Sequence, residues 1–204
     1  DFLSVMSHEI RTPLNAILGL IELMMRGEDS EQDRLSNLSY MEFAGKHLKG
    51  LLTDVLDLER LDSGKAEPHL TPFAPEEFFK RVVNGFQKRA EATGNVLSLE
   101  VEANVPAGLM ADVGWLIQML NNLITNALKF TSDGEIRCHV AWESDLLEVS
   151  VRDTGMGIAP SDLERILEPF EQANREIMVN TANQGVGLGL AITKKLVGLH
   201  GGEL

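Results

Sequence analysis

The stretch Asp1–Met25 has the sequence DFLSVMSHEIRTPLNAILGLIELMM, in which apolar residues recur at alternating steps of three and four. This spacing places them along one side of a helix, in the pattern by which helices pack together in a bundle. The chain is therefore predicted to begin with a long amphipathic helix. The apolar stripe consists of Leu3, Met6, Ile10, Pro13, Ile17, Leu20 and Met24.

A second helix of the same kind is predicted after a short break. Residues 26–30 (RGEDS) contain a glycine and short polar side chains that can turn the chain. Helical spacing then resumes and ends at Asp62-Ser63-Gly64. Two such helices joined by a short loop form a helical hairpin. The apolar stripe of the second helix consists of Ala44, Leu48, Leu51, Val55, Leu58 and Leu61.

One hairpin cannot bury both apolar stripes by itself. Two copies packed as an antiparallel four-helix bundle would bury them, so we predict a homodimer through residues 1–64. The alternative is that both stripes pack against the rest of the same chain.

Beyond residue 64 the apolar pattern changes from helical to alternating. Residues 65–75 include three prolines and are predicted to form a linker that leads into an edge strand. The alternating segments each have one apolar face, which needs one covering layer of helices. Residues 76–204 are therefore predicted to form an α+β two-layer sandwich, so that the chain is multidomain. The expected strands cover Leu97–Val101, Ile136–Trp142 and Leu147–Val151, and the expected helices cover 76–92, 112–130 and 188–200.

The composition restricts the ligands and the compartment. With 18 basic against 31 acidic residues the net charge is −13, which argues against nucleic-acid binding. An anionic ligand would then need a local site built from helix N-termini, backbone amides or a metal. The one cysteine, Cys138, cannot form an intramolecular disulfide or a cysteine zinc site and fits a reducing compartment.

The compartment of this segment is expected from its cysteine usage. A single cysteine fits a reducing compartment, and we expect this segment to be cytoplasmic. No apolar run reaches the roughly 18 residues of a membrane-spanning helix, and no signal peptide precedes the first motif, but neither absence bears on the longer protein. Because the chain opens inside a helical pattern, we also expect it to be a fragment of a longer protein. Attachment of that longer protein to the inner membrane stays an open alternative.

Three polar residues share one face of the expected helix 112–130. At about 100° per residue, Asn122, Asn126 and Lys129 fall within a narrow arc away from the apolar stripe. A carboxamide oxygen can ligate Mg²⁺, and a carboxamide nitrogen or an ammonium can bind phosphate. The alternative is an ordinary solvated helix face.

Two glycine-rich segments have features of a nucleotide site. Asp153-Thr154-Gly155-Met156-Gly157-Ile158 follows a strand, where a carboxylate can accept from an exocyclic amine and glycines let a ligand approach the backbone. The segment 185–190 (GVGLGL) opens a helix, whose N-terminal amides favour anions. About thirty residues between them, including Glu168-Pro169-Phe170, lack clear periodicity and are predicted to form a lid. Ordinary turn chemistry is the alternative for the first segment.

A histidine is predicted on the outer side of the first helix. In a heptad that starts at Leu3, His8 occupies the position that points furthest from the apolar stripe. Thr12 lies one turn further on the same face, and Glu9 can reach a ring nitrogen. Pro13 cannot donate to the carbonyl of Glu9, so the helix is expected to bend there. The alternative is a surface histidine beside a structural kink.

These motifs, in this order, resemble the catalytic core of bacterial-type sensor histidine kinases, and the resemblance covers essentially the whole chain. The ATP-binding part resembles the type shared with gyrase, Hsp90 and MutL, and the amino-acid sequence around His8 is similar to that of hybrid kinases. In the family's terms, the H box is Ser7–Pro13, the N box Asn122–Thr131, the first glycine box Asp153–Ile158, the F box Pro169-Phe170 and the second glycine box Gly185–Leu190.

The resemblance implies a role for each matching residue. His8 would be the phosphorylated residue, Glu9 its acid/base partner, and Thr12 the residue that orients water in a phosphatase reaction. Asn126 would coordinate Mg²⁺, and Asp153 would hold the adenine amine. Phosphate contacts are implied for Asn122 and Lys129, and the ATP site would further include Phe130, Gly155, Gly157, Ile158, Phe170, Arg175, Gly185, Val186, Gly187, Leu188 and Gly189.

The chain departs from the family pattern at three places. Val186 stands where many members have a hydroxyl residue, so a contact from that hydroxyl is lost. Arg175 is the only arginine between the F box and the second glycine box, where relatives often have another nearer the second glycine box. The chain ends at Leu204, before the closing strand of the family, so we expect the ATP-binding domain to be truncated.

The resemblance implies a two-component kinase that phosphorylates itself from MgATP at His8 and passes the phosphate to an aspartate of a response regulator. A phosphatase activity is compatible with Thr12. Two alternatives stay open: an ATP-hydrolysing nucleotide switch without phosphohistidine, and a degenerate kinase that serves as a docking scaffold.

Overall fold

The computed structural model describes residues 2–27, 30–64, 66–171 and 186–204. The chain divides into two compact units, Asp1–Ser63 and Gly64–Leu204. We call them the hairpin unit and the sandwich unit, and each is described by itself. Within the described residues, none of the helices is both long enough and apolar enough to span a membrane.

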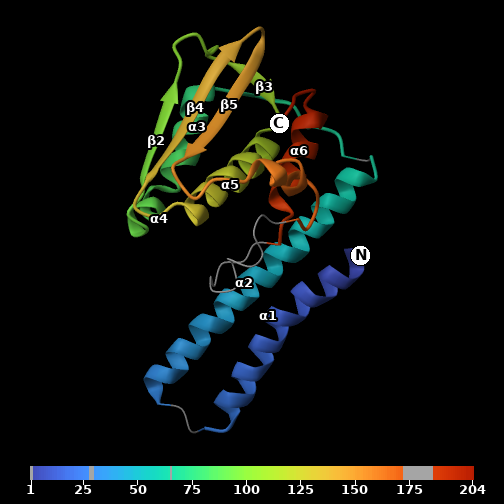
Figure 1. Cartoon of the computed structure of the whole chain (residues 1–204), viewed down its shortest axis with the longest axis vertical. Coiled ribbons are helices and arrows are strands. Elements are labelled where there is room, and N and C mark those ends of the chain that lie inside the picture. Colours follow the sequence, from blue (N-terminus) through green and yellow to red (C-terminus); the bar gives the residue numbers. More distant parts are fainter. Residues whose placement is uncertain (1, 28–29, 65, 172–185) are drawn as a thin grey trace. The chain divides into compact units, whose positions relative to one another are not determined.

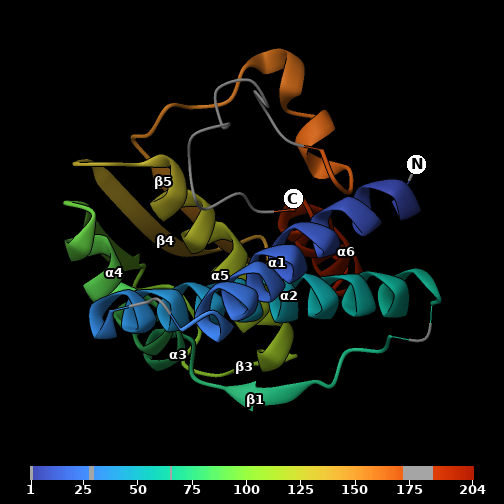
Figure 2. The same ribbon diagram turned by 90° about the horizontal axis from the view of Figure 1, so that it is seen from below.

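The hairpin unit consists of two helices, α1 (Phe2–Met25) and α2 (Glu31–Asp62), which lie side by side (Figures 1 and 2). A capping box starts α2: the Ser30 side chain accepts from the Asp33 amide, and the Asp33 carboxylate accepts from the Ser30 amide. The predicted stripes are confirmed, because their described members are buried or half-buried in the single chain. The most buried of them are Met6 and Pro13 of α1 and Ala44, Leu51 and Leu58 of α2. The premise that one hairpin leaves both stripes uncovered was therefore wrong, since α1 and α2 pack against each other.

A further apolar stripe lies on the exposed side of α1, and the sequence analysis did not identify it. Leu14, Leu18, Ile21 and Met25 follow one another at helical spacing, and their exposed fractions are 41%, 49%, 37% and 81%. The hairpin therefore leaves apolar surface uncovered on α1 in the single chain.

The sandwich unit contains a three-stranded sheet of β2 (Val96–Val101), β4 (Glu135–Glu143) and β5 (Leu146–Asp153), in the order β2-β4-β5. The pair β2/β4 is parallel and the pair β4/β5 is antiparallel. Ser144 and Asp145 connect β4 to β5 with φ values of 50° and 64°, as a tight type I′ hairpin requires. A second sheet pairs β1 (Thr71–Phe73) with β3 (Leu109–Ala111), a strand that the sequence analysis did not predict.

Helices cover the sheet, so the predicted two-layer α+β sandwich is confirmed. In Figure 1 α3 and α5 lie against one face of β2, β4 and β5, and contacts of α3 and α4 with β2 and of α5 with β4 and β5 agree with this view. The core between the layers includes Phe79, Val83, Ile124, Ile136 and Val140, all at most 1% exposed. The helices are α3 (Pro75–Asn84), α4 (Gln87–Ala92), α5 (Val113–Phe130) and α6 (Gly189–Leu199).

One helix prediction was wrong: residues 76–92 form two helices rather than one. The break lies at Gly85 and Phe86, between α3 and α4. The Gly85 amide closes the last turn of α3 on the carbonyls of Arg81 and Val82, and Phe86 turns its ring into the core with 9% exposure. Glycine weakens a helix interior, and burial of the aromatic ring outweighs the loss of continuous helix.

Candidate functional site

His8 projects from α1 into solvent, as predicted. Its side chain is 76% exposed, and its Nδ1 lies 3.6 Å from Oε1 of Glu9. The Thr12 hydroxyl donates to the His8 carbonyl at 3.1 Å, so the two residues lie one turn apart on the same face. Because the carboxylate lies on the Nδ1 side, the neutral tautomer that it favours leaves the lone pair of Nε2 available as a nucleophile.

The N-terminus of α5 is anchored by Asp112. Its Oδ1 accepts from the Trp115 amide at 3.0 Å and its Oδ2 from the His69 amide at 2.8 Å. Partial burial opposes ionisation, but hydrogen bonds from the Trp115, His69 and Gly114 amides together outweigh it, and the pKa of Asp112 lies below its ordinary value. This cap ties the start of α5 to the segment that precedes β1 and so positions the polar face of α5.

The three polar residues of α5 are half-buried, so they do not form an ordinary solvated face. Burial lowers the pKa of the Lys129 ammonium, whose Nζ lies 4.8 Å from the centre of the Phe130 ring. The Asn122 amide donates to the Gly189 carbonyl at 3.0 Å and to the Thr193 hydroxyl at 3.3 Å. Asn122 therefore joins α5 to the first turn of α6, a role that the sequence analysis did not foresee.

The first glycine box begins where β5 ends. Oδ1 of Asp153 accepts from the Gly155 amide at 2.9 Å and from the Thr131 hydroxyl at 3.3 Å. A Cβ on Gly155 would overlap the carbonyl oxygen of Phe130. This packing requires glycine and brings the carboxylate of Asp153 next to the end of α5, which carries Lys129 and Phe130. Gly157, with a φ of 69°, and the exposed Ile158 continue the loop.

A buried asparagine that the sequence analysis missed supports this arrangement. Asn95 is 5% exposed; its Nδ2 donates to the Thr131 carbonyl at 2.8 Å and its Oδ1 accepts from the Gly134 amide at 2.9 Å. These bonds hold the chain where α5 ends and β4 begins. An isolated asparagine 36 positions before Thr131 has no signal in the sequence that could have indicated this role.

The F box and the second glycine box contact each other through their backbones. The Phe170 amide donates to the Gly187 carbonyl at 3.0 Å, and a Cβ on Gly187 would lie 2.7 Å from the Glu171 carbonyl oxygen. Gly189 opens α6, whereas the side chains of Phe170, Val186 and Leu188 are buried. Arg175 and Gly185, both expected at this site, lie outside the described residues.

The predicted residues therefore fall into two sets, one on each unit. The sandwich unit brings Lys129, Phe130 and the first glycine box together at the end of α5, and Asn122 links the same helix to the second glycine box. His8, Glu9 and Thr12 belong to the hairpin unit. Such a pair of sites can bind an anionic ligand on one unit and present a nucleophile on the other.

Two family models match the chain. The model described as "His Kinase A (phospho-acceptor) domain" matches residues 1–64. The model described as "Histidine kinase-, DNA gyrase B-, and HSP90-like ATPase" matches residues 111–204.

Curated relatives match over the whole chain. The non-motile and phage-resistance protein of Caulobacter vibrioides is 39% identical over 212 residues, which is 100% of this chain and 25% of that protein. The signal transduction histidine-protein kinase BarA of Escherichia coli K12 is 35% identical over 209 residues, which is 100% of this chain and 22% of that protein. The chain thus spans about a quarter of the length of these relatives.

Solved structures resemble the chain as well. Full-length ShkA in complex with AMPPNP matches with a TM-score of 0.73 and 34% identity, over 98% of this chain and 41% of that one. The histidine kinase ThkA in complex with the response regulator protein TrrA matches with a TM-score of 0.66 and 25% identity, over 85% of this chain and 52% of that one.

Proposed function

The chain belongs to the sensor histidine kinase family, and on this premise we propose that it transfers the γ-phosphoryl group of ATP to its own His8 and then to an aspartate of a response regulator. Residues 1–64 would carry the phosphoacceptor and 76–204 the ATP site, with 65–75 as the linker. The observation that carries the proposal is the exposed His8 ring with Glu9 on its Nδ1 side. The same chain also places Asp153 of the first glycine box next to the end of α5, which carries Lys129.

ATP fits the residues around the first glycine box. Asp153 is exposed and could accept from the adenine amine through Oδ2, while its Oδ1 is engaged by Gly155 and Thr131. Because Gly155 packs against the Phe130 backbone, the loop lies close to the end of α5. The half-buried Lys129 could offer a cation to the phosphates, which an acidic chain otherwise repels. The similarity to a kinase solved with AMPPNP, an ATP analogue, supports this assignment.

Mg²⁺ is expected to accompany ATP, with the phosphates as its main ligands. Among the residues that the structure describes, no group of three or more His, Cys, Asp or Glu side chains could hold a metal ion. Asn126 offers a carboxamide oxygen from the polar face of α5, and Mg²⁺ commonly binds through few protein ligands plus substrate phosphates. When bound, the ion would neutralise charge that develops on the phosphates during transfer.

The chemistry at His8 follows from its ring environment. Nε2 attacks the γ-phosphorus in line, the bond to the β,γ-bridging oxygen breaks, and ADP leaves with that electron pair. The proton on Nδ1 becomes acidic once Nε2 carries the phosphoryl group, and Glu9 is placed to accept it and release it to water. Because His8 and the ATP residues belong to different units, transfer requires the two units to approach each other.

Dimerisation and a regulator partner complete the proposal. The exposed stripe Leu14, Leu18, Ile21 and Met25 on α1 would be covered by the hairpin of a second copy in a four-helix bundle. A receiver domain would dock near His8, and the similarity to ThkA solved with TrrA supports this kind of partner. Thr12 lies on the same face of α1 as His8 and would orient the attacking water in a phosphatase reaction.

Autophosphorylation with γ-labelled ATP and Mg²⁺ tests the proposal. We expect label on the chain that survives base and is lost in mild acid, as a phosphoramidate is. The His8→Gln variant should carry no label, whereas His47→Gln, a matched change on α2, should be labelled like the wild type. Label that resists acid, or that persists in His8→Gln, would contradict the proposal. Phosphate release without label on the chain would favour the nucleotide switch, and absence of MgATP binding would favour the docking scaffold.

A further inference from the structure

An arginine outside the predicted motifs joins two carboxylates of the sandwich unit. Arg165 lies in η2 (Arg165–Leu167), in the segment between β5 and α6. Its Nη2 lies 3.0 Å from Oδ1 of Asp162, and its Nε lies 3.4 Å from Oε2 of Glu171. Two different nitrogens of one planar guanidinium thus engage two acidic residues, a geometry that lysine cannot reproduce.

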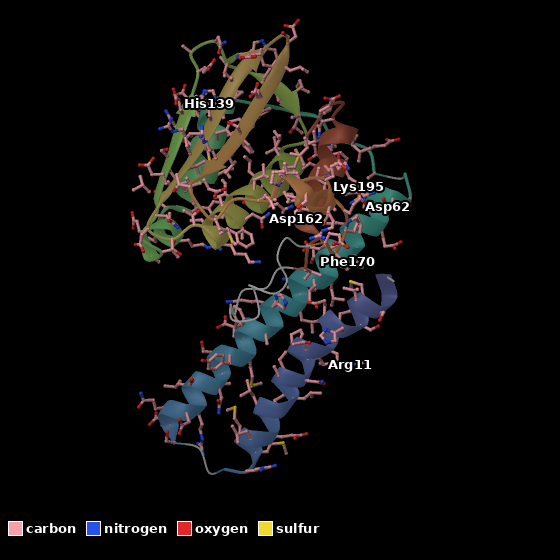
Figure 3. All side chains as sticks on the ribbon, viewed as in Figure 1. Arg11, Asp62, His139, Asp162, Phe170 and Lys195 are labelled. Carbon is pink, nitrogen blue, oxygen red and sulfur yellow. The ribbon has the colours of Figure 1, made fainter. Side chains whose placement is uncertain are left out.

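The two carboxylates belong to different parts of the ATP site. Asp162 closes η1 (Pro160–Asp162), which follows the first glycine box directly, and its side chain is only 11% exposed. Glu171 follows Phe170, and its carbonyl oxygen lies against Gly187 of the second glycine box. Arg165 therefore links η1, which follows the first glycine box, to the backbone that lies against the second. Figure 3 labels Asp162 and Phe170 in this segment.

A neighbouring ion pair strengthens the connection to α6. Nζ of Lys194 lies 3.8 Å from Oε1 of Glu168, and η2 packs against α6. Isolated surface ion pairs contribute little to stability, but one cation shared by two carboxylates, one of them largely buried, fixes geometry as well as charge. Removing Arg165 would leave two acidic groups close to a site that must hold a polyanion.

We propose that Arg165 is a positioning residue for nucleotide binding, which holds the first and second glycine boxes in register through Asp162 and Glu171. This inference rests on the proposed function, because it concerns the same ATP site. The groups assigned to phosphoryl transfer, His8 on α1 and Asn126 and Lys129 on α5, lie on other elements. Loss of Arg165 is therefore expected to weaken MgATP binding and to leave the transfer rate at saturating MgATP unchanged.

Calorimetric titration of the full chain with AMPPNP and Mg²⁺ tests the proposal. We expect Arg165→Gln to raise the Kd roughly tenfold, as loss of one charge-assisted hydrogen bond predicts, and Arg165→Lys to fall between it and the wild type. Glu171→Gln should also raise the Kd, and the double variant should bind no more weakly than Arg165→Gln alone, because both changes break the same link. Lys80→Gln, which removes the 2.6 Å ion pair with Glu76 on α3, is the matched control.

A second readout separates positioning from general damage. The single-turnover rate of autophosphorylation at saturating MgATP should be the same in wild type and Arg165→Gln. An unchanged Kd in both Arg165→Gln and Glu171→Gln would overturn the inference, and so would a transfer rate that falls while the Kd stays constant. If Arg165→Gln does not fold, the Kd of Glu171→Gln alone decides: a raised Kd supports the inference, and an unchanged Kd overturns it. A wild-type chain that binds no nucleotide would instead overturn the proposed function.

Discussion

Substitution of Gly187 by alanine tests the packing of the F box against the second glycine box, two motifs of the proposed ATP site. Gly187 has a φ of 78°, and a Cβ there would lie 2.7 Å from the Glu171 carbonyl oxygen and 3.0 Å from the Phe170 carbonyl carbon. Gly201 has the same φ of 78° with nothing within 4 Å of the added Cβ. The two glycines therefore share the cost of a left-handed residue but differ in steric overlap.

The magnitudes follow from this difference. A non-glycine residue in the left-handed region costs about 1–2 kcal/mol, and this cost applies to both variants. At Gly187 the atoms in the way belong to backbone and cannot rotate aside, and overpacking of that kind costs about 1–3 kcal/mol more. We therefore expect Gly187→Ala to lower the free energy of unfolding by about 2–5 kcal/mol and Gly201→Ala by about 1–2 kcal/mol.

Denaturant unfolding followed by tryptophan fluorescence measures this difference. Both tryptophans, Trp115 and Trp142, lie in the sandwich unit, so the signal reports on that unit. Gly187→Ala should also weaken MgATP binding, while Gly201→Ala should not. Equal losses of stability in the two variants would refute the close backbone contact between Gly187 and Glu171.

Three further changes have defined outcomes. Asn126→Ala should lower autophosphorylation about 10–100-fold, with partial recovery at high Mg²⁺. Asn121→Ala, at an exposed position of the same helix, should have no effect in the same assay. Asp112→Ala should lower the unfolding free energy by about 2–3 kcal/mol, because it removes a helix cap and the bond to the His69 amide, and Asp112→Asn, which keeps an acceptor oxygen, should cost less. Because the native pKa of Asp112 is lowered, the loss in Asp112→Ala should shrink as the pH falls through that pKa, down to the part that a neutral acceptor still provides, as measured by thermal unfolding. Burial raises the pKa of the Cys138 thiol to about 11, so a thiol reagent at pH 8 should label the protein only after unfolding. The free energy of unfolding should decline as the pH rises from 9 toward 11, because the unfolded chain releases the thiol proton more readily than the native protein.

Much of the fold was predictable because it depends on patterns within single elements. The steps of three and four in residues 1–25 and 44–61 predicted the packed sides of α1 and α2, and alternation predicted β2, β4 and β5. Periodicity could not predict β3, because three residues are too few to show a period. The break between α3 and α4 was missed because burial of Phe86, a tertiary effect, outweighs local helical spacing.

The candidate site divides in the same way. The exposure of His8 followed from its place in a heptad, since a helix alone determines which residues share a face. The link from Asn122 to Gly189 spans 67 positions and the link from Asn95 to Thr131 spans 36, and no local pattern encodes either. Arg165 is a mixed case: Asp162 lies three positions before it, a spacing that local structure can pair, but no pattern in the sequence indicates that the same guanidinium also meets Glu171.

The amino-acid sequence by itself determined which residues are candidates for the chemistry and which faces of the helices and strands are apolar, because both depend on residue type and on spacing within one element. Only the tertiary structure decided which polar groups hold the two glycine-rich segments to α5 and to each other. Hydrogen bonds and ion pairs between distant parts of a chain form where folding brings the groups within about 3 Å, and packing of the whole sandwich sets those distances.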